Sequence, residues 1–196
     1  MPCEGIVMGA AYDCENPIVP GVIQRLILVN QVDWEEAVKT FDVALTSLLT
    51  NVALPTGKQG WAFQGIRTSL KPQSAYVPGT NSIGYDHQTD FIVFDISQEQ
   101  KDNLQGLALN KVVGIVQNMN AVGNANSVFE VFGKDTGLEL ITNIRINDDA
   151  ETSGGYAISL KTSDNAGKEP KLPTSWWDTD FVTTLPLVEA LLVPAP

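Results

Sequence analysis

Residues 111–142 read KVVGIVQNMNAVGNANSVFEVFGKDTGLELIT, and this stretch decides the fold class. Its first segment, 111–117, is β-branched and apolar, as expected of a buried strand. The segment 127–132 alternates apolar and polar residues, and the Asn- and Gly-rich loop before it predicts a hairpin. A tight turn at 133–137 then leads into a further strand at 138–142. Successive strands joined by turns indicate a β-rich domain.

Short strand-like segments continue in both directions from this stretch. They are residues 22–29, 61–68, 75–77, 89–96 and 156–162. Gly- and Pro-containing turns separate them, which is typical of an all-β fold with long loops. The last strands are predicted to form a meander. We therefore expect a mainly β fold, with a single β-rich domain over residues 22–167.

One clear helix is predicted at about residues 97–108. Ser97 and Gln100 have the spacing of a capping box, and Leu104 and Leu107 begin an apolar stripe. The segment 33–50 is ambiguous. Its apolar residues recur at helical spacing, which predicts an amphipathic helix, whereas its Thr residues favour a strand.

Both ends of the chain differ from the domain between them. Residues 1–21 are rich in Gly, Pro and Ala without any periodic pattern, so we expect an extended arm. Residues 168–196 form a Pro-broken, apolar tail that is predicted to pack on the domain or on a neighbouring subunit. A short helix is expected at 185–193, with Pro186 in its first turn.

Composition excludes several classes of function. The chain has 196 residues, with 12 Lys and Arg against 23 Asp and Glu, and a formal net charge of −11. That length suffices for one domain with its own core. Proteins that grip nucleic acid bind phosphate through clustered cations, so DNA is not expected to bind specifically. The sequence carries no run that predicts a signal peptide or a membrane span, and we expect folding in the cytoplasm of the host cell.

The residues needed for most enzymatic sites are scarce. His87 is the single histidine, expected in an exposed loop, and Cys3 and Cys14 lack the spacing of a zinc site. No nucleophile motif accompanies the histidine. The acidic run that holds Asp148, Asp149 and Glu151 lacks the ligand spacing of a calcium loop. We therefore expect no catalytic residues, no metal site, no cofactor and no enzymatic activity.

Several motifs resemble those of a known group of virion proteins. They are residues 56–63 (TGKQGWAF), 94–97 (FDIS), 132–140 (FGKDTGLEL), 154–160 (GGYAISL), 169–173 (EPKLP) and 178–180 (DTD). In these motifs the chain resembles tail-tube-like structural proteins of tailed bacteriophages and prophages from Bacteroidetes-type hosts. The resemblance covers most of the chain from Val22 onward, and its motifs are structural turns rather than chemical signatures.

The resemblance implies a β-sandwich or small barrel with one main helix, and a place in the virion, most of all in its tail. Proteins of this kind close into hexameric rings that stack around a lumen through which DNA passes, so the expected partners are further copies of the chain and other virion proteins. An acidic lumen would let DNA slide, because like charges offer phosphate no trapping site. No membrane partner is expected.

Contact residues are assigned from this picture. Those expected between subunits are Cys3, Tyr12, Pro17, Trp176, Trp177, Phe181, Leu185 and Leu191. The loop-rich stretch 71–85, with Lys71, Tyr76, Asn81 and Tyr85, is expected to stack rings or face the lumen. The acidic lumen candidates are Asp148, Asp149 and Glu151.

Two alternatives remain open from the sequence. A head decoration or head-completion protein of the same phage would also be β-rich, acidic and symmetric. A carbohydrate-binding module could use the tryptophans of the tail, because exposed aromatic side chains serve as binding platforms.

Overall fold

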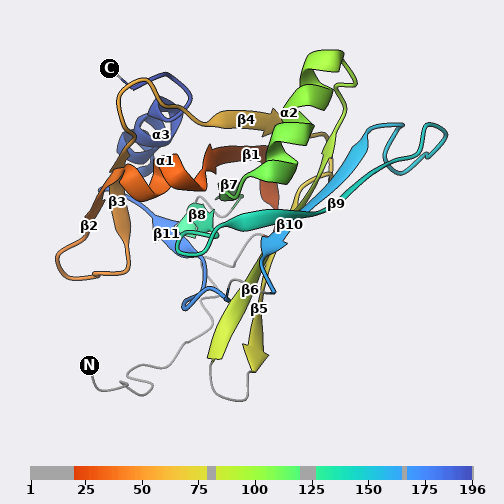
Figure 1. Ribbon diagram of the computed structural model, residues 1–196. Coiled ribbons are helices and arrows are strands. Elements are labelled where there is room, and N and C mark those ends of the chain that lie inside the picture. Colours follow the sequence, from red (N-terminus) through yellow and green to blue (C-terminus); the bar gives the residue numbers. More distant parts are fainter. Residues whose placement is uncertain (1–19, 79–82, 120–126, 165–166, 196) are drawn as a thin grey trace.

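The computed structural model describes residues 20–78, 83–119, 127–164 and 167–195. Within these ranges the chain is mainly β, as predicted (Figure 1). The strands are β1 (Val22–Asn30), β2 (Val38–Phe41), β3 (Leu49–Ala53), β4 (Trp61–Gln64), β5 (Lys71–Pro78), β6 (Ile83–Val93), β7 (Val112–Asn118), β8 (Phe129–Phe132), β9 (Leu138–Arg145), β10 (Tyr156–Thr162) and β11 (Thr174–Trp176). The helices are α1 (Gln31–Glu36), α2 (Gln98–Leu109) and α3 (Phe181–Ala190).

One hydrogen-bonded sheet connects all the strands. Its order is β2-β3-β11-β8-β7-β9-β10-β6-β5, and β1 pairs with both β7 and β4 beside this path. β7 and β8 form the predicted hairpin. The predicted meander is confirmed for β9 and β10, which pair antiparallel, but it is wrong for β8 and β9, because both pair with the same edge of β7, through Phe132 and Leu138. Gly133 and Gly137, both at positive φ, build the tight turn that returns the chain to its former direction.

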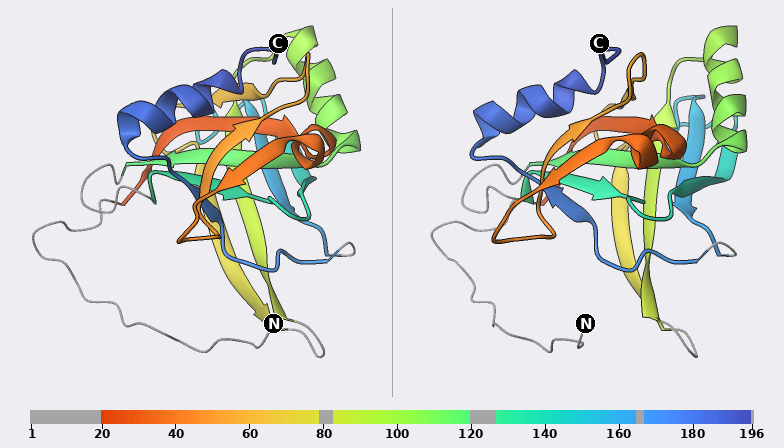
Figure 2. Two further views of the ribbon diagram at one scale, coloured as in Figure 1. Left: turned by 90° about the vertical axis from the view of Figure 1, so that its left-hand side faces the viewer. Right: turned by 60° about the vertical axis from the view of Figure 1, so that its left-hand side comes forward.

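Alternate residues of β1 enter two different cores. Ile27 and Val29 belong to a cluster on one face, whereas Leu26 and Leu28 belong to a second cluster on the other face. This alternation follows from the two-residue repeat of a strand. The first cluster is closed by β11, by α3 and by the residues that follow α3. The second is closed by β6, β10 and α2, so the central strands are covered on both sides (Figure 2).

The helix predicted at 97–108 is confirmed as α2. Its N-cap is Ser97, whose hydroxyl accepts a hydrogen bond from the Gln100 backbone N–H at 3.2 Å. Leu104 and Leu107 are its buried residues. The return bond of a capping box, from the Ser97 backbone N–H to the Gln100 side-chain oxygen, is not made, because that N–H donates to the Asp95 carboxylate at 2.8 Å instead. The capping box is therefore only half formed.

The helix predicted over 33–50 is wrong. α1 ends at Glu36, and β2 and β3 follow as an antiparallel pair. Trp34 and Leu49 are fully buried, but Val43 is 96% exposed and Leu45 is 54% exposed in the loop between the strands. The helical spacing of these apolar residues was accidental, and pairing of β3 with β11 in the sheet outweighs local helix propensity.

The C-terminal tail contributes to the sheet and the core. β11 pairs with β8, and the Trp176 indole N–H donates to the Thr50 carbonyl at 3.1 Å. The predicted limits of the last helix are wrong: α3 begins at Phe181, after Asp180, whose carboxylate accepts from the Thr183 backbone N–H. Pro186 therefore lies inside the helix rather than in its first turn.

Candidate functional site

The long β5–β6 hairpin projects from the body of the molecule (Figure 1, Figure 2). The two strands pair without interruption from Lys71 opposite Asp90 to Pro78 opposite Ile83. The strand predicted at 75–77 is therefore confirmed inside β5, whereas the loop expected over the rest of 71–85 is wrong for the described part of this stretch. Pro72 and Pro78 read as loop residues in the sequence. They are tolerated here because β5 ends the sheet, where a missing N–H can face away from the partner strand.

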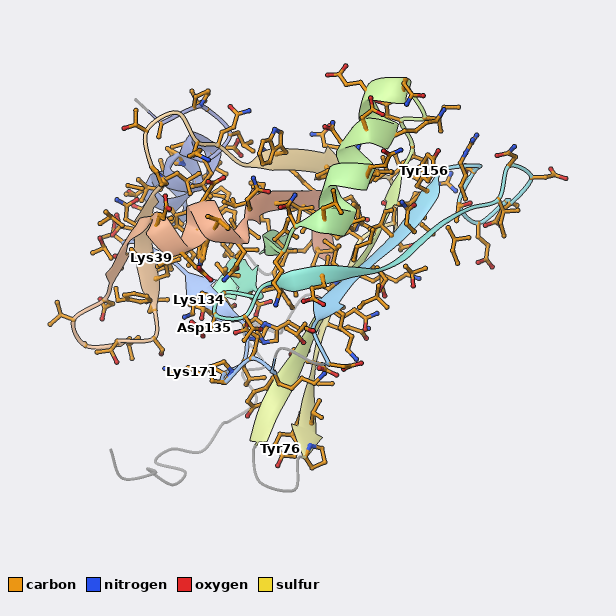
Figure 3. The ribbon with its side chains drawn as sticks, viewed as in Figure 1. Lys39, Tyr76, Lys134, Asp135, Tyr156 and Lys171 are labelled. Carbon is orange, nitrogen blue, oxygen red and sulfur yellow. The ribbon has the colours of Figure 1, made fainter. Side chains whose placement is uncertain are left out.

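Few contacts cover the free part of this hairpin. Most residues of β5 are exposed, including Lys71. Tyr76 is 57% exposed and packs edge-to-face on Tyr85, with ring centroids 5.9 Å apart. Figure 3 shows Tyr76 on the distal half of the hairpin, away from the body. The hairpin therefore offers an aromatic side chain and a strand edge to solvent.

His87 anchors the base of the hairpin to the body. The prediction that it lies in an exposed loop is wrong, since it is 1% exposed within β6. Its Nδ1 accepts from the Gly133 backbone N–H at 3.1 Å, and its Nε2 lies 3.0 Å from the Lys171 carbonyl oxygen. A neutral ring protonated at Nε2 satisfies both contacts. Burial lowers the pKa of His87 to about 4, although the Lys171 carbonyl opposes this shift.

Glu169 completes this anchor. It is 1% exposed, and its carboxylate accepts from the backbone N–H of Thr136 at 2.8 Å and from the Thr136 hydroxyl at 2.9 Å. The Asp135 backbone N–H donates to the same carboxylate at 3.1 Å. Backbone hydrogen bonds also run in both directions between Glu169 and Tyr85. The start of the tail thus joins the hairpin to the β8–β9 turn; Asp135 and Lys171 mark this region in Figure 3.

The anchor is structural in its geometry. Both ring nitrogens of His87 are engaged with backbone groups, and the Glu169 carboxylate is filled by three donors. Across the described part of the chain, no three His, Cys, Asp or Glu residues come close enough to hold a metal ion. Glu169 belongs to one of the motifs that carry the resemblance, but no role was predicted for it, because a single glutamate before a proline has no chemical signature.

The predicted inter-subunit residues of the tail lie in the chain's own first core. Trp176 and Leu191 are buried members of that cluster, so they cannot contact another subunit while the domain is folded. Trp177, Phe181 and Leu185 are partly buried against the same cluster. The burial of Trp176 also removes the pair of tail tryptophans as a carbohydrate platform. These apolar residues serve the monomer's own core.

The predicted acidic residues lie in the turn between β9 and β10. Asp148 and Glu151 are exposed, and Asp149 is half-buried. The Asp149 carboxylate accepts from the Glu151 backbone N–H at 3.0 Å and from the Thr152 hydroxyl at 2.9 Å. These bonds lower the pKa of Asp149. Asp149 therefore shapes the turn, and the other two carboxylates are free to face whatever lies outside it.

The sheet has a second exposed end at β2. Val38 is 70% exposed in this edge strand, and the apolar loop residues Val43 and Leu45 continue the exposed surface. Edge strands present unpaired backbone groups to which another chain can add. The two ends of the sheet path, β2 and β5, are thus both open in the described structure.

Some expected positions lie outside the described residues. They are Cys3, Tyr12, Pro17 and Asn81. Within the described ranges, no helix combines the length and the apolar character needed to cross a membrane.

Comparisons with known proteins return nothing: no protein-family model, curated protein or solved structure matches this chain.

Proposed function

We propose that this chain is a virion structural protein, the major tail tube protein of a tailed bacteriophage, whose copies form stacked hexameric rings around a DNA-conducting lumen. The observation that carries the proposal is the pair of exposed strands, β2 and β5, at the two ends of one continuous sheet. Its partners would be further copies of itself and other virion proteins, and its location the virion tail.

The described sheet leaves the edges of β2 and β5 open as well as the short outer edge of β4, and a contact between two different edges favours a ring over a closed dimer. When β2 of one copy pairs with β5 of the next, the contact is head-to-tail and repeats around the assembly. Such contacts close into a ring when the rotation between copies allows it. Pro72 and Pro78 limit the usable edge of β5 to the residues between them, because prolines offer no N–H to a partner strand. The strand pairing between β2 of one copy and β5 of the next would therefore be short, with a defined register.

The charge distribution supports a passage for DNA. Against a net charge of −11, several cations are already held in ion pairs, including Arg25 with Glu189, Lys58 with Asp33 and Lys111 with Glu139. Six of the twelve Lys and Arg residues are held in such pairs, which halves the number of cations free to trap phosphate. We assign the exposed carboxylates of Asp148 and Glu151 to the wall of the lumen, where they would repel DNA.

A substitution in the middle of β5 tests the ring contact. Pro72, Ser74 and Pro78 lie at even offsets along the strand, so the N–H of Ser74 faces the outer edge toward which the two prolines also point their ring nitrogens. Ser74→Pro should therefore block addition of a strand while leaving the β5–β6 ladder intact. Ser74→Ala is the matched control, because it keeps the N–H.

Sedimentation velocity of the purified full chain gives the readout. The wild type and Ser74→Ala are expected to sediment as ring-sized assemblies, and Ser74→Pro as a folded monomer with an unchanged circular dichroism spectrum. A wild-type protein that stays monomeric at high concentration would contradict the proposal. Trimers would favour a head decoration protein instead. If Ser74→Pro forms rings like those of the wild type, β5 is not the strand that joins neighbouring copies.

A further inference from the structure

A cleft of about 370 Å³ is lined mainly by residues of α2 and β4. Figure 1 shows these two elements at the opposite end of the molecule from the β5–β6 hairpin. This volume is at the lower end of the range of about 300–1,000 Å³ that is usual for small-molecule sites. Its lining includes the buried apolar residues Leu28 and Val112, together with residues of the helix and the strand. The remaining lining residues are Asn30, Trp61, Ala62, Phe63, Gln100, Asp102, Asn103, Gly106, Leu107 and Asn110.

Residue 106, in the helix that lines this cleft, is a glycine although nothing in the fold requires one there. A Cβ built at this position would meet no atom within 4 Å. Glycine inside a helix costs about 0.5–1 kcal/mol relative to alanine. Here neither a close contact within the chain nor a positive φ accounts for that cost. The missing side chain leaves room for something to approach the helix closely from the cleft.

A polar group and an aromatic ring in the cleft also lack a role in the fold. The side-chain amide nitrogen of Gln100 is buried and has no hydrogen-bond partner among the described residues. Such an unpaired buried donor costs about 1–3 kcal/mol. Trp61, across the cleft on β4, is 46% exposed although it is the largest apolar side chain of that strand. Both groups would gain from a bound partner.

The charge of the lining excludes anionic ligands. The residues that line the cleft include no Lys, Arg or His, and Asp102 is their one charged side chain. A phosphate, sulfate or carboxylate group would be repelled there and would find no cation to pair with. A neutral ligand with both an apolar face and hydrogen-bonding groups fits the lining best.

We propose that this cleft binds a short neutral saccharide. The apolar face of a sugar ring would lie on the Trp61 indole, as apolar groups do on exposed aromatic rings. Its hydroxyls would meet Gln100, Asn103 and Asp102, because amides and carboxylates offer the donors and acceptors that hydroxyl groups match. The Gln100 amide nitrogen is buried in the unliganded structure, so its side chain would turn toward the ligand to gain the missing hydrogen bond. The space over Gly106 would admit the ring.

A peptide strand added to β4 fits less well. β4 has four residues, so its outer edge offers only about two backbone pairs to an added strand. The polar groups that face the cleft come mainly from side chains of α2 rather than from a backbone edge.

Gly106→Ala separates a binding role from a structural one. The added methyl group should raise the unfolding temperature by about 2–4 °C, since it removes the cost of glycine in a helix. The same methyl would occupy the space needed by the sugar ring and lower its affinity at least tenfold. Trp61→Ala should also lower the affinity for the sugar at least tenfold. Leu109→Ala, on the same helix but outside the lining, is the matched control.

Isothermal titration calorimetry of the full chain supplies the test, with cellohexaose, chitohexaose, mannohexaose and an uncharged extended hexapeptide as probes. Saturable binding of at least one hexasaccharide, weakened by Gly106→Ala and unchanged by Leu109→Ala, is expected. The proposal is overturned if none of the three sugars binds, if only the peptide binds, or if Gly106→Ala binds like the wild type. Ring assembly is measured by sedimentation and saccharide binding by calorimetry, so a failure of one proposal does not affect the other.

Discussion

The body of the molecule and the β5–β6 hairpin use the same kind of strand for opposite purposes. In the body, β1 and β7 are covered on both faces by two apolar clusters. In the hairpin, β5 carries polar and exposed residues over nearly its whole length, and its outer edge is open. The body holds itself together by burial, whereas the outer hairpin depends on its backbone ladder. This division leaves the hairpin free for contact with other molecules.

The His87 and Glu169 anchor lies where these two regions meet. It replaces apolar burial by hydrogen bonds to backbone groups of the β8–β9 turn and of the tail. Buried polar groups stabilise a structure only when their hydrogen bonds are made. The comparison therefore predicts large effects in the body, intermediate effects at the anchor and small effects on the hairpin.

The largest loss of stability is expected for Trp176→Ala. The side chain is fully buried in the first core, and its indole N–H donates to Thr50. Removing it should lower the free energy of unfolding by about 3–5 kcal/mol. Urea denaturation followed by circular dichroism measures this change. Val182→Ala in α3, which is 78% exposed, should change it by less than about 0.5 kcal/mol. If Trp176→Ala and Val182→Ala changed the free energy of unfolding equally, Trp176 would not be part of the core.

Glu169→Ala should cause the next largest loss of stability. It leaves three donors of the β8–β9 turn without their acceptor, at a cost of about 2–4 kcal/mol. Amide hydrogen exchange should become faster at Thr136, whose N–H loses its carboxylate acceptor, and to a smaller extent at Tyr85, whose N–H donates to the backbone carbonyl of the loosened residue 169. Glu169→Gln keeps one acceptor oxygen and should lose less. Unchanged exchange in the alanine variant would mean that the hairpin is held by its strands alone.

Sequence patterns predicted the regular parts of this fold well. The capped helix beginning after Ser97, the buried β7 strand and the β7–β8 hairpin each follow from local signals, and each is confirmed. The β2–β3 pair was missed because its burial depends on β11, a strand over a hundred residues later.

The anchor and the cleft could not be found in the sequence, because they exist only after distant segments meet. His87 bonds to Gly133 and Lys171, and neither partner is near it in the chain. Gly106 is an ordinary helix residue until the structure shows open space above it. The prolines of β5 gave a misleading loop signal, since an edge strand tolerates them.

The anchor should also make stability depend on pH. His87 has a pKa of about 4 in the folded protein, below its ordinary value of 6.5, because burial disfavours the charged ring. Between these values the unfolded chain binds more protons, so the free energy of unfolding falls as pH is lowered from about 6.5 to about 4. The loss should reach about 2–3 kcal/mol. This loss of stability is absent above about pH 6.5 and does not grow further below about pH 4.

His87→Gln isolates this contribution. The variant is less stable at neutral pH, but its free energy of unfolding should fall less than that of the wild type over the same window. Urea titrations at several pH values supply the comparison. Parallel curves for the two proteins would show that His87 does not titrate as described.

The smallest effect on the monomer is expected for Tyr76→Ser. This side chain is mostly exposed and contacts the Tyr85 ring, so stability should change by less than about 0.5 kcal/mol. If the hairpin joins stacked rings, the variant should still form single rings but fewer tubes. Tyr76→Phe keeps the ring and should behave like the wild type. Negative-stain micrographs give the ratio of rings to tubes, and an unchanged ratio would exclude Tyr76 from stacking.

The central claim is that the uncovered edges of this sheet join copies of the chain into a ring. Negative-stain electron microscopy of the purified wild-type protein at high concentration tests it most directly. We expect hollow rings with six-fold symmetry, some of them stacked into tubes. A field of uniform monomers, with no ring at any concentration, would contradict the account.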